Sequence, residues 1–351
     1  MAGVYLSVWS FNFFNKIGAC HLGKQLGLSF FTYIAIDLGS SSTKVYLPSK
    51  DLFIEEPSLI ALEQKSEQVI AIGLEAQKLF GMAPHRITVV ELQKPWDLSN
   101  VNFTIQFLQA LLEKIFGKRN KRIHEALFSI PGSFSEFEQD IFLKHLKVLP
   151  IRNSFFVRAP IAGAIGAGFQ LSHPEANMFI DLGGGKTEIS IICLNNIISS
   201  HYQDLGGKDL SRGLQEYCES KFEFLIGFME AEFIKTIHGS VAPSNEVSSI
   251  EVKGTQKSNR LPGKLKLTTA EIQEALLPII MRILKGISTV SKKVHPEIAA
   301  DIVTNGLTFW GGGAKLKGLG DLMRQEFNLK VFQPSEPHLC VIQGMKKILT
   351  R

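Results

Sequence analysis

Apolar and polar residues alternate along two short stretches of the chain, and a turn of small residues interrupts each alternation. The stretches are YIAIDLGSSSTKVYL at residues 33–47 and NMFIDLGGGKTEIS at residues 177–190. Alternation with a period of two is typical of half-buried strands, so each stretch predicts a β-hairpin. Three residues recur in one register 144 positions later: Asp37, Gly39 and Thr43 return as Asp181, Gly183 and Thr187. We therefore expect two halves of similar design, each opening with a hairpin whose turn faces a shared cleft.

Other stretches of the chain carry apolar residues at helical spacing. They predict helices at residues 105–116, 210–224, 230–237 and 337–350, an Ala/Gly-rich helix at 160–168 that permits very close packing, and a strand, glycine turn and helix within 308–327. Two more helices are predicted to begin with capping boxes, which pair Ser133 with Glu136 and Thr268 with Glu271. Pro278 is expected to kink the second of these. With two strands predicted in residues 240–267, the mixture indicates an α/β fold.

The first 32 residues form an apolar leader that has no charged residue before Lys16. The leader lacks the basic start and clear cleavage site of a secretory signal, and its apolar run is shorter than a membrane-spanning helix needs. Trp9, Phe11, Phe13 and Phe14 suit an anchor in the membrane interface, with Lys16 near lipid headgroups. Two interpretations stay open: attachment to a membrane surface, and a leader that is unstructured or has a wrongly assigned start.

Length and composition narrow the class of protein. The 351 residues suffice for one large or two ordinary domains, and 45% hydrophobic with 20% charged residues is typical of a soluble globular chain. The net charge of +5 is mild, and no long basic stripe points to nucleic acid. The densest basic run, residues 118–122, is expected to be a solvated helix cap. The four cysteines lack metal-binding spacing, which favours a reducing compartment and argues against zinc.

The two hairpin turns contain the residue types that a bound polyphosphate needs. Glycine and small hydroxyl residues let backbone N–H groups approach phosphate oxygens closely. Magnesium keeps most of its waters and takes one or two carboxylates besides phosphate oxygens, so Asp37 and Asp181 are predicted to be its outer partners. The residues expected to hold the phosphates are Ser40, Ser41, Ser42 and Thr43 in the first turn and Gly183, Gly184, Gly185, Lys186 and Thr187 in the second. A third glycine turn at residues 311–313 strengthens the prediction of nucleotide binding.

Beyond these turns, much of the chain resembles the MreB family of bacterial actin-like cell-shape proteins, within the actin and heat-shock-chaperone ATPase superfamily. The resembling segments include IAIDLGSSST, EEPSLIALE, PIAGAIGAG, DLGGGKTEISII, LGGKDLSRGL and GGGAKLKGL, and the resemblance extends from about residue 33 to residue 349. Residues 250–277 are the part that looks most like MreB rather than like chaperones or sugar kinases.

The resemblance implies an actin-like ATPase fold, with two duplicated ribonuclease-H-like halves and inserted subdomains around a nucleotide cleft. The halves would be residues 33–158 and 159–336, and a C-terminal helix at 337–351 would pack back on the first half. By the same resemblance, Glu232 and Lys235 would flank the adenosine. The loop beneath the base would consist of Gly312, Gly313, Ala314 and Lys315. The implied cofactors are ATP, or GTP, and magnesium.

The resemblance also implies partners and a location. Members of the family assemble with copies of themselves into filaments, so the expected partners are this chain itself, a second MreB-like protein and the cell-wall elongation machinery. The expected location is the cytoplasm, at the inner face of the cytoplasmic membrane. No nucleic acid is expected as a partner.

The chain departs from the family pattern where chemistry is expected. The family has a Glu-Glu-Pro whose second Glu positions the attacking water, whereas this chain has Arg158, Ala159 and Pro160. A positioned base contributes roughly 10²–10⁴ in rate, so we expect slow or negligible hydrolysis without a loss of binding. Arg158 is either a phosphate contact or a surface residue, and Trp310, in place of a Thr, either stacks on the base or crowds it. Lys186 also replaces a Thr and is suited to neutralise phosphate charge.

Three hypotheses for the function follow. The leading one is a nucleotide-binding, filament-forming cytoskeletal protein that helps to determine cell shape and guide cell-wall synthesis. In the second, the chain keeps the fold but does not hydrolyse nucleotide, and it acts as a scaffold that co-assembles with an active MreB. The third, a small-molecule kinase on the same fold, is disfavoured because we identify no acid beside the second hairpin that could deprotonate an acceptor hydroxyl.

Overall fold

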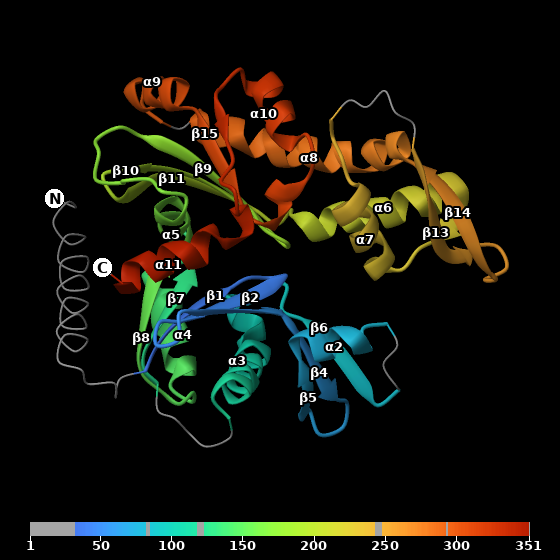
Figure 1. The fold of residues 1–351 in the computed structure, drawn as a ribbon, viewed down its shortest axis with the longest axis horizontal. Coiled ribbons are helices and arrows are strands. Elements are labelled where there is room, and N and C mark those ends of the chain that lie inside the picture. The colour runs from blue at the N-terminus through green and yellow to red at the C-terminus, as the bar shows by residue number, and fades with distance from the viewer. Residues whose placement is uncertain (1–31, 82–84, 118–122, 243–247, 293, 351) are drawn as a thin grey trace. The chain divides into compact units, whose positions relative to one another are not determined.

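The computed structural model describes residues 32–81, 85–117, 123–242, 248–292 and 294–350, and Figure 1 shows their fold. The chain divides into two compact units. The first unit comprises the described residues of Met1–Ile130, Phe134–Gly166 and Val341–Arg351, and the second those of Pro131–Ser133 and Ala167–Cys340. Residues 1–31 of the predicted leader and the basic run at 118–122 lie outside the described residues. Among the described residues, no helix has both the length and the apolar character needed to cross a bilayer.

The first unit is built on a five-stranded sheet of order β3-β2-β1-β7-β8. Its strands are β1 Tyr33–Leu38, β2 Ser42–Leu47, β3 Leu52–Pro57, β7 Ile123–Ile130 and β8 Ile151–Arg158. A smaller sheet contains β4 Leu59–Glu63, β5 Val69–Ile72 and β6 Ile87–Glu91. The helices of this part of the chain are α2 Gly73–Leu79, η1 Leu98–Asn100, α3 Val101–Phe116, α4 Glu136–Leu146 and α5 Ala159–Gly166.

The second unit repeats the arrangement with a five-stranded sheet of order β11-β10-β9-β15-β16. Its strands are β9 Asn177–Leu182, β10 Thr187–Cys193, β11 Asn196–Gln203, β15 Leu307–Trp310 and β16 Val331–Phe332, and a second sheet contains β12 Phe224–Leu225, β13 Ser249–Gln256 and β14 Pro262–Thr268. The helices are α6 Gly207–Phe222, α7 Phe228–His238, α8 Thr269–Ser291, α9 Pro296–Asn305, η2 Gly312–Lys315, α10 Leu319–Phe327 and η3 Pro337–Leu339. The chain closes with α11 Cys340–Thr350.

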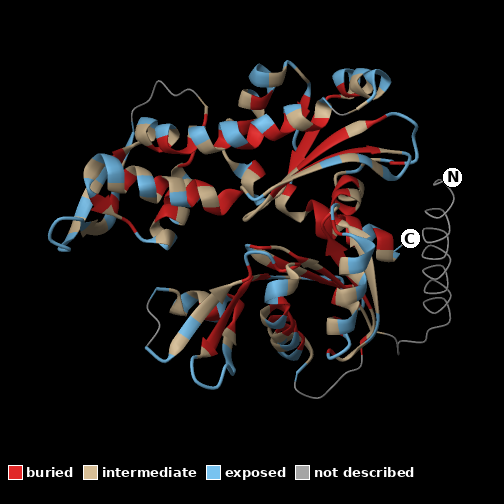
Figure 2. Ribbon diagram, turned by 180° about the vertical axis from the view of Figure 1, so that it is seen from behind, coloured by how far each residue is buried: buried red, intermediate tan, exposed pale blue. Residues whose placement is uncertain are grey.

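The two large sheets confirm the internal repeat that the sequence predicts. In each sheet the first three strands form an antiparallel meander, and two further strands run parallel to the first strand. The strands β1 and β9 begin and end 144 positions apart and share one pattern of buried and half-buried residues. Both predicted hairpins are present, as β1–β2 and β9–β10. Figure 2 shows that the central strands of both sheets are largely buried.

An aromatic cluster around Trp96 forms part of the core of the first unit. Its ring lies 4.5 Å from that of Phe142, 5.7 Å from Phe134 and 6.1 Å from Phe156, measured between centroids. Aromatic pairs at such separations stabilise a core beyond the area that they bury. The cluster therefore ties α4 and β8 to the segment that precedes α3.

The predicted capping box of Ser133 and Glu136 is wrong. The N-cap of α4 is Ser135, whose side chain accepts from the Glu138 N–H at 3.3 Å, while Glu138 accepts from the Ser135 N–H at 2.8 Å. The sequence SFSEFE holds two overlapping Ser-x-x-Glu pairs. Burial of the Phe134 ring in the aromatic cluster decides between them, because it holds residue 134 before the helix as an apolar N′ residue.

Other predicted elements are confirmed with small shifts of their ends. The capping box of Thr268 and Glu271 begins α8, and the hydrogen bond from the Thr268 N–H holds the pKa of the Glu271 carboxyl below its usual value. Beyond Pro278 the same helix continues to Ser291. The helix predicted at 210–224 is α6, which ends earlier because Phe224 lies in β12 with its ring buried.

The C-terminal helix α11 packs very closely on α5, as the Ala/Gly-rich sequence of α5 predicts. A Cβ at Gly344 would overlap the carbonyl oxygen of Ala162. Lys347 Nζ donates to the Ile165 carbonyl at 2.9 Å, and Lys346 Nζ donates to Asp51 at 2.6 Å. The absence of a side chain at Gly344 thus sets the distance between two helices of the first unit.

Replacing Gly344 with Ala is expected to lower the free energy of unfolding by about 1–3 kcal/mol, because one of the two backbones must shift to admit the methyl group. Urea unfolding measures the change. The matched control is Gly320→Ala in α10, where a Cβ would meet the Phe309 ring at an ordinary 3.5 Å. Equal losses in the two variants would contradict the close approach of α5 and α11.

Candidate functional site

The β1–β2 turn presents Asp37 at the end of a buried strand. Its carboxylate is half-buried and accepts a hydrogen bond of 2.6 Å from the hydroxyl of Ser129, which lies on the neighbouring strand β7. A carboxylate that accepts such a bond is held in one orientation, with further lone pairs left for other partners. Asp37 therefore stands where the sequence predicts it, with its direction set by a serine that sequence reasoning did not identify.

The hydroxyl residues of the first turn hold the turn itself. Ser58 donates to the Gly39 carbonyl at 2.6 Å, which leaves Thr43 as the donor of the 2.9 Å bond to Ser58. Ser42 donates to Glu55 at 2.6 Å. Thr43 is fully buried and Ser40 is 8% exposed. The hydroxyls of Ser42 and Thr43 are thus engaged within the first unit.

The β9–β10 turn is fixed by the start of α6. A Cβ at Gly206 would lie 2.7 Å from the carbonyl oxygens of Gly183 and Gly184, so only glycine allows the two backbones to meet. The Gly207 N–H donates to the Gly183 carbonyl at 3.0 Å, and the Lys208 N–H donates to the Gly184 carbonyl at 2.7 Å. The first N–H groups of α6, which are unpaired within a helix, therefore bind the turn.

Thr187 plays the same part in the second hairpin as Thr43 plays in the first. Its side chain is fully buried, and its hydroxyl donates to the Leu205 carbonyl at 2.7 Å. Both threonines of the repeat thus bond to the segment that follows the third strand of their sheet. Their recurrence in the sequence reflects the packing of the hairpins.

The predicted pair on α7 joins the same assembly. Lys235 Nζ donates to the two oxygens of Glu232 at 2.6 and 2.7 Å and to the Gly207 carbonyl at 2.9 Å. Ser211 donates to Glu232 at 2.6 Å. Burial lowers the pKa of the Lys235 ammonium, and the charge of Glu232 opposes that shift. Because Gly207 also bonds to Gly183, the pair is connected to the hairpin turn through the start of α6.

The third glycine turn lies directly beside Asp181. The parallel strands β9 and β15 place Trp310 opposite Asp181, and the turn follows at once (Figure 1). Gly311 has a φ of 90°, and a Cβ there would lie 2.7 Å from Asp181 Oδ1. A side chain at Gly313 would overlap that of Leu182. Glycine at both positions therefore lets the turn approach the carboxylate.

The rest of this loop presents both exposed and buried residues. Gly312 and Lys315 are exposed, and a Cβ at Gly312 would meet open space. Ala314 is buried, and its carbonyl accepts from Gln333 at 2.9 Å. Trp310 is 1% exposed with its ring 5.3 Å from that of Phe179, so the indole is a core residue.

The segment that departs from the family pattern carries no carboxylate. Ala159 begins α5 and is buried, and the Arg158 guanidinium donates to the Phe134 carbonyl at 3.3 Å. Arg158 therefore has a role within the first unit that sequence reasoning did not foresee.

Sequence reasoning also missed Glu188, an acid on β10. It is 1% exposed and lies opposite Asp181 in the antiparallel pair of β10 and β9. Its Oε1 accepts from the Gly132 N–H at 2.7 Å, and its Oε2 lies 3.8 Å from Lys186 Nζ. The signal was present in the alternation of the strand, which places residues 186 and 188 on one face. Because Glu188 is almost fully buried, it does not present a base to an acceptor hydroxyl, and the kinase hypothesis gains nothing from it.

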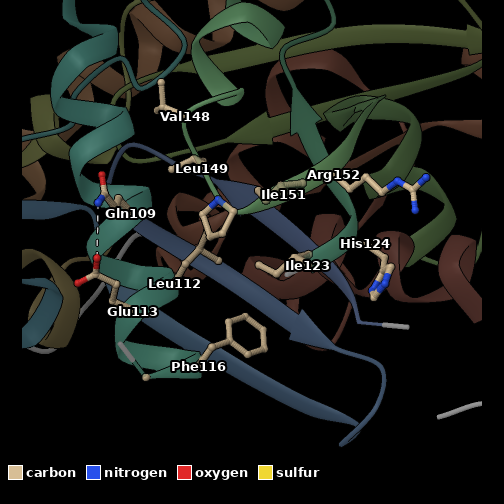
Figure 3. A pocket seen from close by; sticks show the side chains of 12 residues that line it. Gln109, Leu112, Glu113, Phe116, Ile123, His124, Val148, Leu149, Ile151 and Arg152 are labelled. Carbon is tan, nitrogen blue, oxygen red and sulfur yellow. Dashed lines mark hydrogen bonds between the residues drawn. The ribbon is translucent and has the colours of Figure 1, made fainter. Parts of the chain in front are cut away.

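A separate cavity of about 970 Å³ lies in the first unit, and Figure 3 shows the side chains that line it. The end of α3 contributes Leu112 and Phe116, and the start of β7 contributes His124. Leu149 lies just before β8, and Arg152 lies at its start. The cavity lies by the first residues of β7, whereas Asp37 lies near the other end of the parallel strand β1, and none of the predicted site residues lines the cavity. Among the described residues, no group of three or more His, Cys, Asp or Glu side chains forms a metal cluster.

Comparison with known proteins finds one family for nearly the whole chain. The family model of the MreB/Mbl protein matches residues 31–351. The cell shape-determining protein MreB of Escherichia coli (strain K12) is 30% identical over 321 residues, which cover 90% of this chain and 92% of that protein. The cell shape-determining protein Mbl of Bacillus subtilis (strain 168) is 28% identical over 311 residues, which cover 89% and 93%.

Solved structures show the same likeness. MreB5 of Spiroplasma citri bound to AMPPNP is similar with a TM-score of 0.84 and 26% identity, over 90% of this chain and 95% of that one. The same protein bound to ADP gives a TM-score of 0.85. The MamK double helical filament shares the fold, with a TM-score of 0.74 and 18% identity over 91% of this chain and 99% of that one.

Proposed function

The chain belongs to the MreB/Mbl family of actin-like cell shape-determining proteins, and we propose that it binds ATP, or GTP, with magnesium and assembles with copies of itself into filaments. The filaments would lie at the inner face of the cytoplasmic membrane and guide cell-wall synthesis there. Hydrolysis of the nucleotide would be slow. A second MreB-like protein and the wall-elongation machinery are the further partners that we propose.

One observation carries the proposal of nucleotide binding. The first strand of each large sheet has a carboxylate, Asp37 or Asp181, one residue before its end, and a turn built from small residues follows. The solved relative from Spiroplasma citri, at 26% identity, is described as bound to AMPPNP and to ADP. In this chain the phosphates would meet the backbones of Ser40–Thr43 and Gly183–Thr187, with the adenosine near Glu232, Lys235 and residues 312–315.

The residues of the two turns fit a hydrated magnesium ion. Mg²⁺ takes carboxylate oxygens as ligands and keeps several waters, and an ion held here would neutralise phosphate charge. Asp37 is oriented by Ser129, and Asp181 lies against Gly311 with no side chain between them. Glu188, on the strand beside Asp181, has a buried Oε2 that accepts no hydrogen bond from the described residues, so it could accept one from a metal-bound water.

Slow hydrolysis follows from the start of α5. The family places a water-positioning carboxylate where this chain has Ala159, and the adjacent guanidinium of Arg158 donates to Phe134. The alternative function, a non-hydrolysing scaffold that co-assembles with an active MreB, rests on the same observation. The two differ in whether any phosphate is released by the purified filament.

Nucleotide binding is tested with the purified full chain and a fluorescent ATP analogue in excess magnesium. Asp181→Asn is expected to weaken binding about ten- to a hundredfold, the usual cost of losing a group that orients the water shell of a metal. The matched control, Asp321→Asn, removes the same charge from an exposed position on α10 and should leave the affinity unchanged. If the unaltered chain does not bind the ATP analogue, the proposal of nucleotide binding is wrong.

The missing acid is tested by Ala159→Glu, with Ala159→Gln as the uncharged control. If the rest of the site is competent, phosphate release should rise by up to roughly 10²–10⁴, because a positioned base is restored. The unaltered chain should pellet with ATP and release little phosphate. Turnover by the unaltered chain that equals the Ala159→Glu rate would contradict the role assigned to residue 159.

Membrane attachment concerns the leader, residues 1–32, nearly all of which lie outside the described residues. Deletion of residues 2–30 is expected to reduce co-sedimentation with anionic liposomes to the background level, because it removes the aromatic residues and lysines suited to the interface. Nucleotide affinity of the deleted chain serves as the control for folding. Unchanged co-sedimentation would rule out the leader as the anchor.

A further inference from the structure

Four side chains form one row across the large sheet of the second unit. The strand registers place Tyr202 of β11 opposite Glu188 of β10, Glu188 opposite Asp181 of β9, and Asp181 opposite Trp310 of β15. Residues paired in this way lie on one face of a sheet. The opposite face carries Ile180, Leu182 and their neighbours, which belong to the hydrophobic core. The row therefore brings two carboxylates together beside the second hairpin turn.

The carboxylate of Glu188 is buried with only half of its hydrogen-bonding needs met. Oε1 accepts from the Gly132 N–H, whereas Oε2 has no hydrogen-bond donor among the described residues. Like charges directly opposite on paired strands destabilise each other, and Asp181 is opposite Glu188. A buried charge needs a counter-ion, and the cation at hand is Lys186, 3.8 Å from Oε2.

Lys186 is held in place from several sides. Its ammonium lies 5.5 Å from the centre of the Tyr202 ring, which attracts a cation by its π-face. Its carbonyl accepts from the Gly183 N–H at 2.9 Å, which closes the turn. Its side chain is nevertheless 24% exposed, and at 3.8 Å the pair with Glu188 is longer than a hydrogen bond. The N–H donors of the ammonium thus have room for an anion at the turn.

In the first unit, a lysine stands at the position that corresponds to Glu188. There the residue opposite Asp37 is Lys44, which lies 144 positions before Glu188 and pairs with Glu55 at 3.6 Å. The first row thus alternates acid and base across its strands. In the second row an acid stands at the place of the lysine, and the cation comes from Lys186 at the turn itself.

We propose that Lys186 is a built-in counter-ion at the phosphate turn, which supplies positive charge that a divalent cation otherwise brings. This inference rests on the proposed nucleotide binding. Lys186 then neutralises part of the phosphate charge beside the magnesium ion proposed at Asp37 and Asp181. Removal of magnesium therefore weakens nucleotide binding less in this chain than in a variant that lacks Lys186. A lysine ammonium is suited to the task because it is a compact point charge on a long stem.

The test compares the dissociation constant of a fluorescent ADP in excess EDTA with that in excess magnesium, using the full chain. The dissociation constant in EDTA divided by that in magnesium should be about ten- to a hundredfold larger for Lys186→Gln than for the unaltered protein. This is the range expected for loss of one charge-assisted contact. The matched control, Lys285→Gln on the exposed side of α8, should leave the ratio unchanged. Thermal unfolding midpoints verify that each variant is folded.

Glu188→Gln separates charge from structure. Its amide oxygen can still accept from the Gly132 N–H, so the anchoring of that segment is kept, while Lys186 loses its internal partner and is released toward phosphate. Affinity in EDTA should therefore stay equal or rise. Weaker binding in EDTA by this variant would overturn the inference.

The outcomes also separate the inference from the proposal on which it rests. Equal dependence on magnesium in the unaltered chain and in Lys186→Gln overturns the inference and leaves nucleotide binding standing. Absence of binding in both buffers overturns the proposed function, and the inference with it.

Discussion

The docking of the start of α6 on the second hairpin turn is the contact on which the rest of the second unit's candidate site depends. Gly206 has no side chain, so the backbone of the helix reaches the carbonyls of Gly183 and Gly184. The same helix start passes the connection on to α7, because the Gly207 carbonyl accepts from Lys235. The absence of a side chain at Gly206 thus allows the hairpin turn, the start of α6 and the Glu232–Lys235 ion pair to contact one another. A larger residue at 206 would separate all three.

The framework of the fold could be read from the sequence because it depends on local patterns. Period-two alternation gave both hairpins, helical spacing gave most of the helices, and the recurrence of Asp, Gly and Thr gave the repeat. The details that failed depend on contacts between distant residues. The start of α4 at Ser135 depends on burial of Phe134 against Trp96, which no local pattern encodes. The same holds for Glu188, which becomes noticeable only when the strand register sets it beside Asp181.

The sequence predicted which segments of the second unit lie together better than it predicted the contacts of individual side chains. Within the second unit, the structure brings the second hairpin turn together with the Glu232–Lys235 pair on α7 and with the third glycine turn. Binding of one ligand by all three would require this arrangement. Thr43 and Thr187 use their hydroxyls for contacts within their own units, and Trp310 is a core residue. A hydroxyl or an indole N–H can form an equally good hydrogen bond with a group inside the protein or with a ligand. Packing decides which of the two partners it takes. A sequence motif therefore identifies a turn more reliably than it identifies which atoms of the turn face outward.

The close approach of Gly344 to Ala162 has a consequence for biosynthesis. The first unit is made of separate stretches of chain, and its last helix is synthesised only after every residue of the second unit. Domains fold as their residues emerge, so the second unit has its full sequence while the surface of α5 still awaits its cover. A ribosome that stops at residue 340 would release a complete second unit attached to a first unit with an uncovered helix. The integrity of the first unit thus depends on a helix that is synthesised after the whole of the second unit.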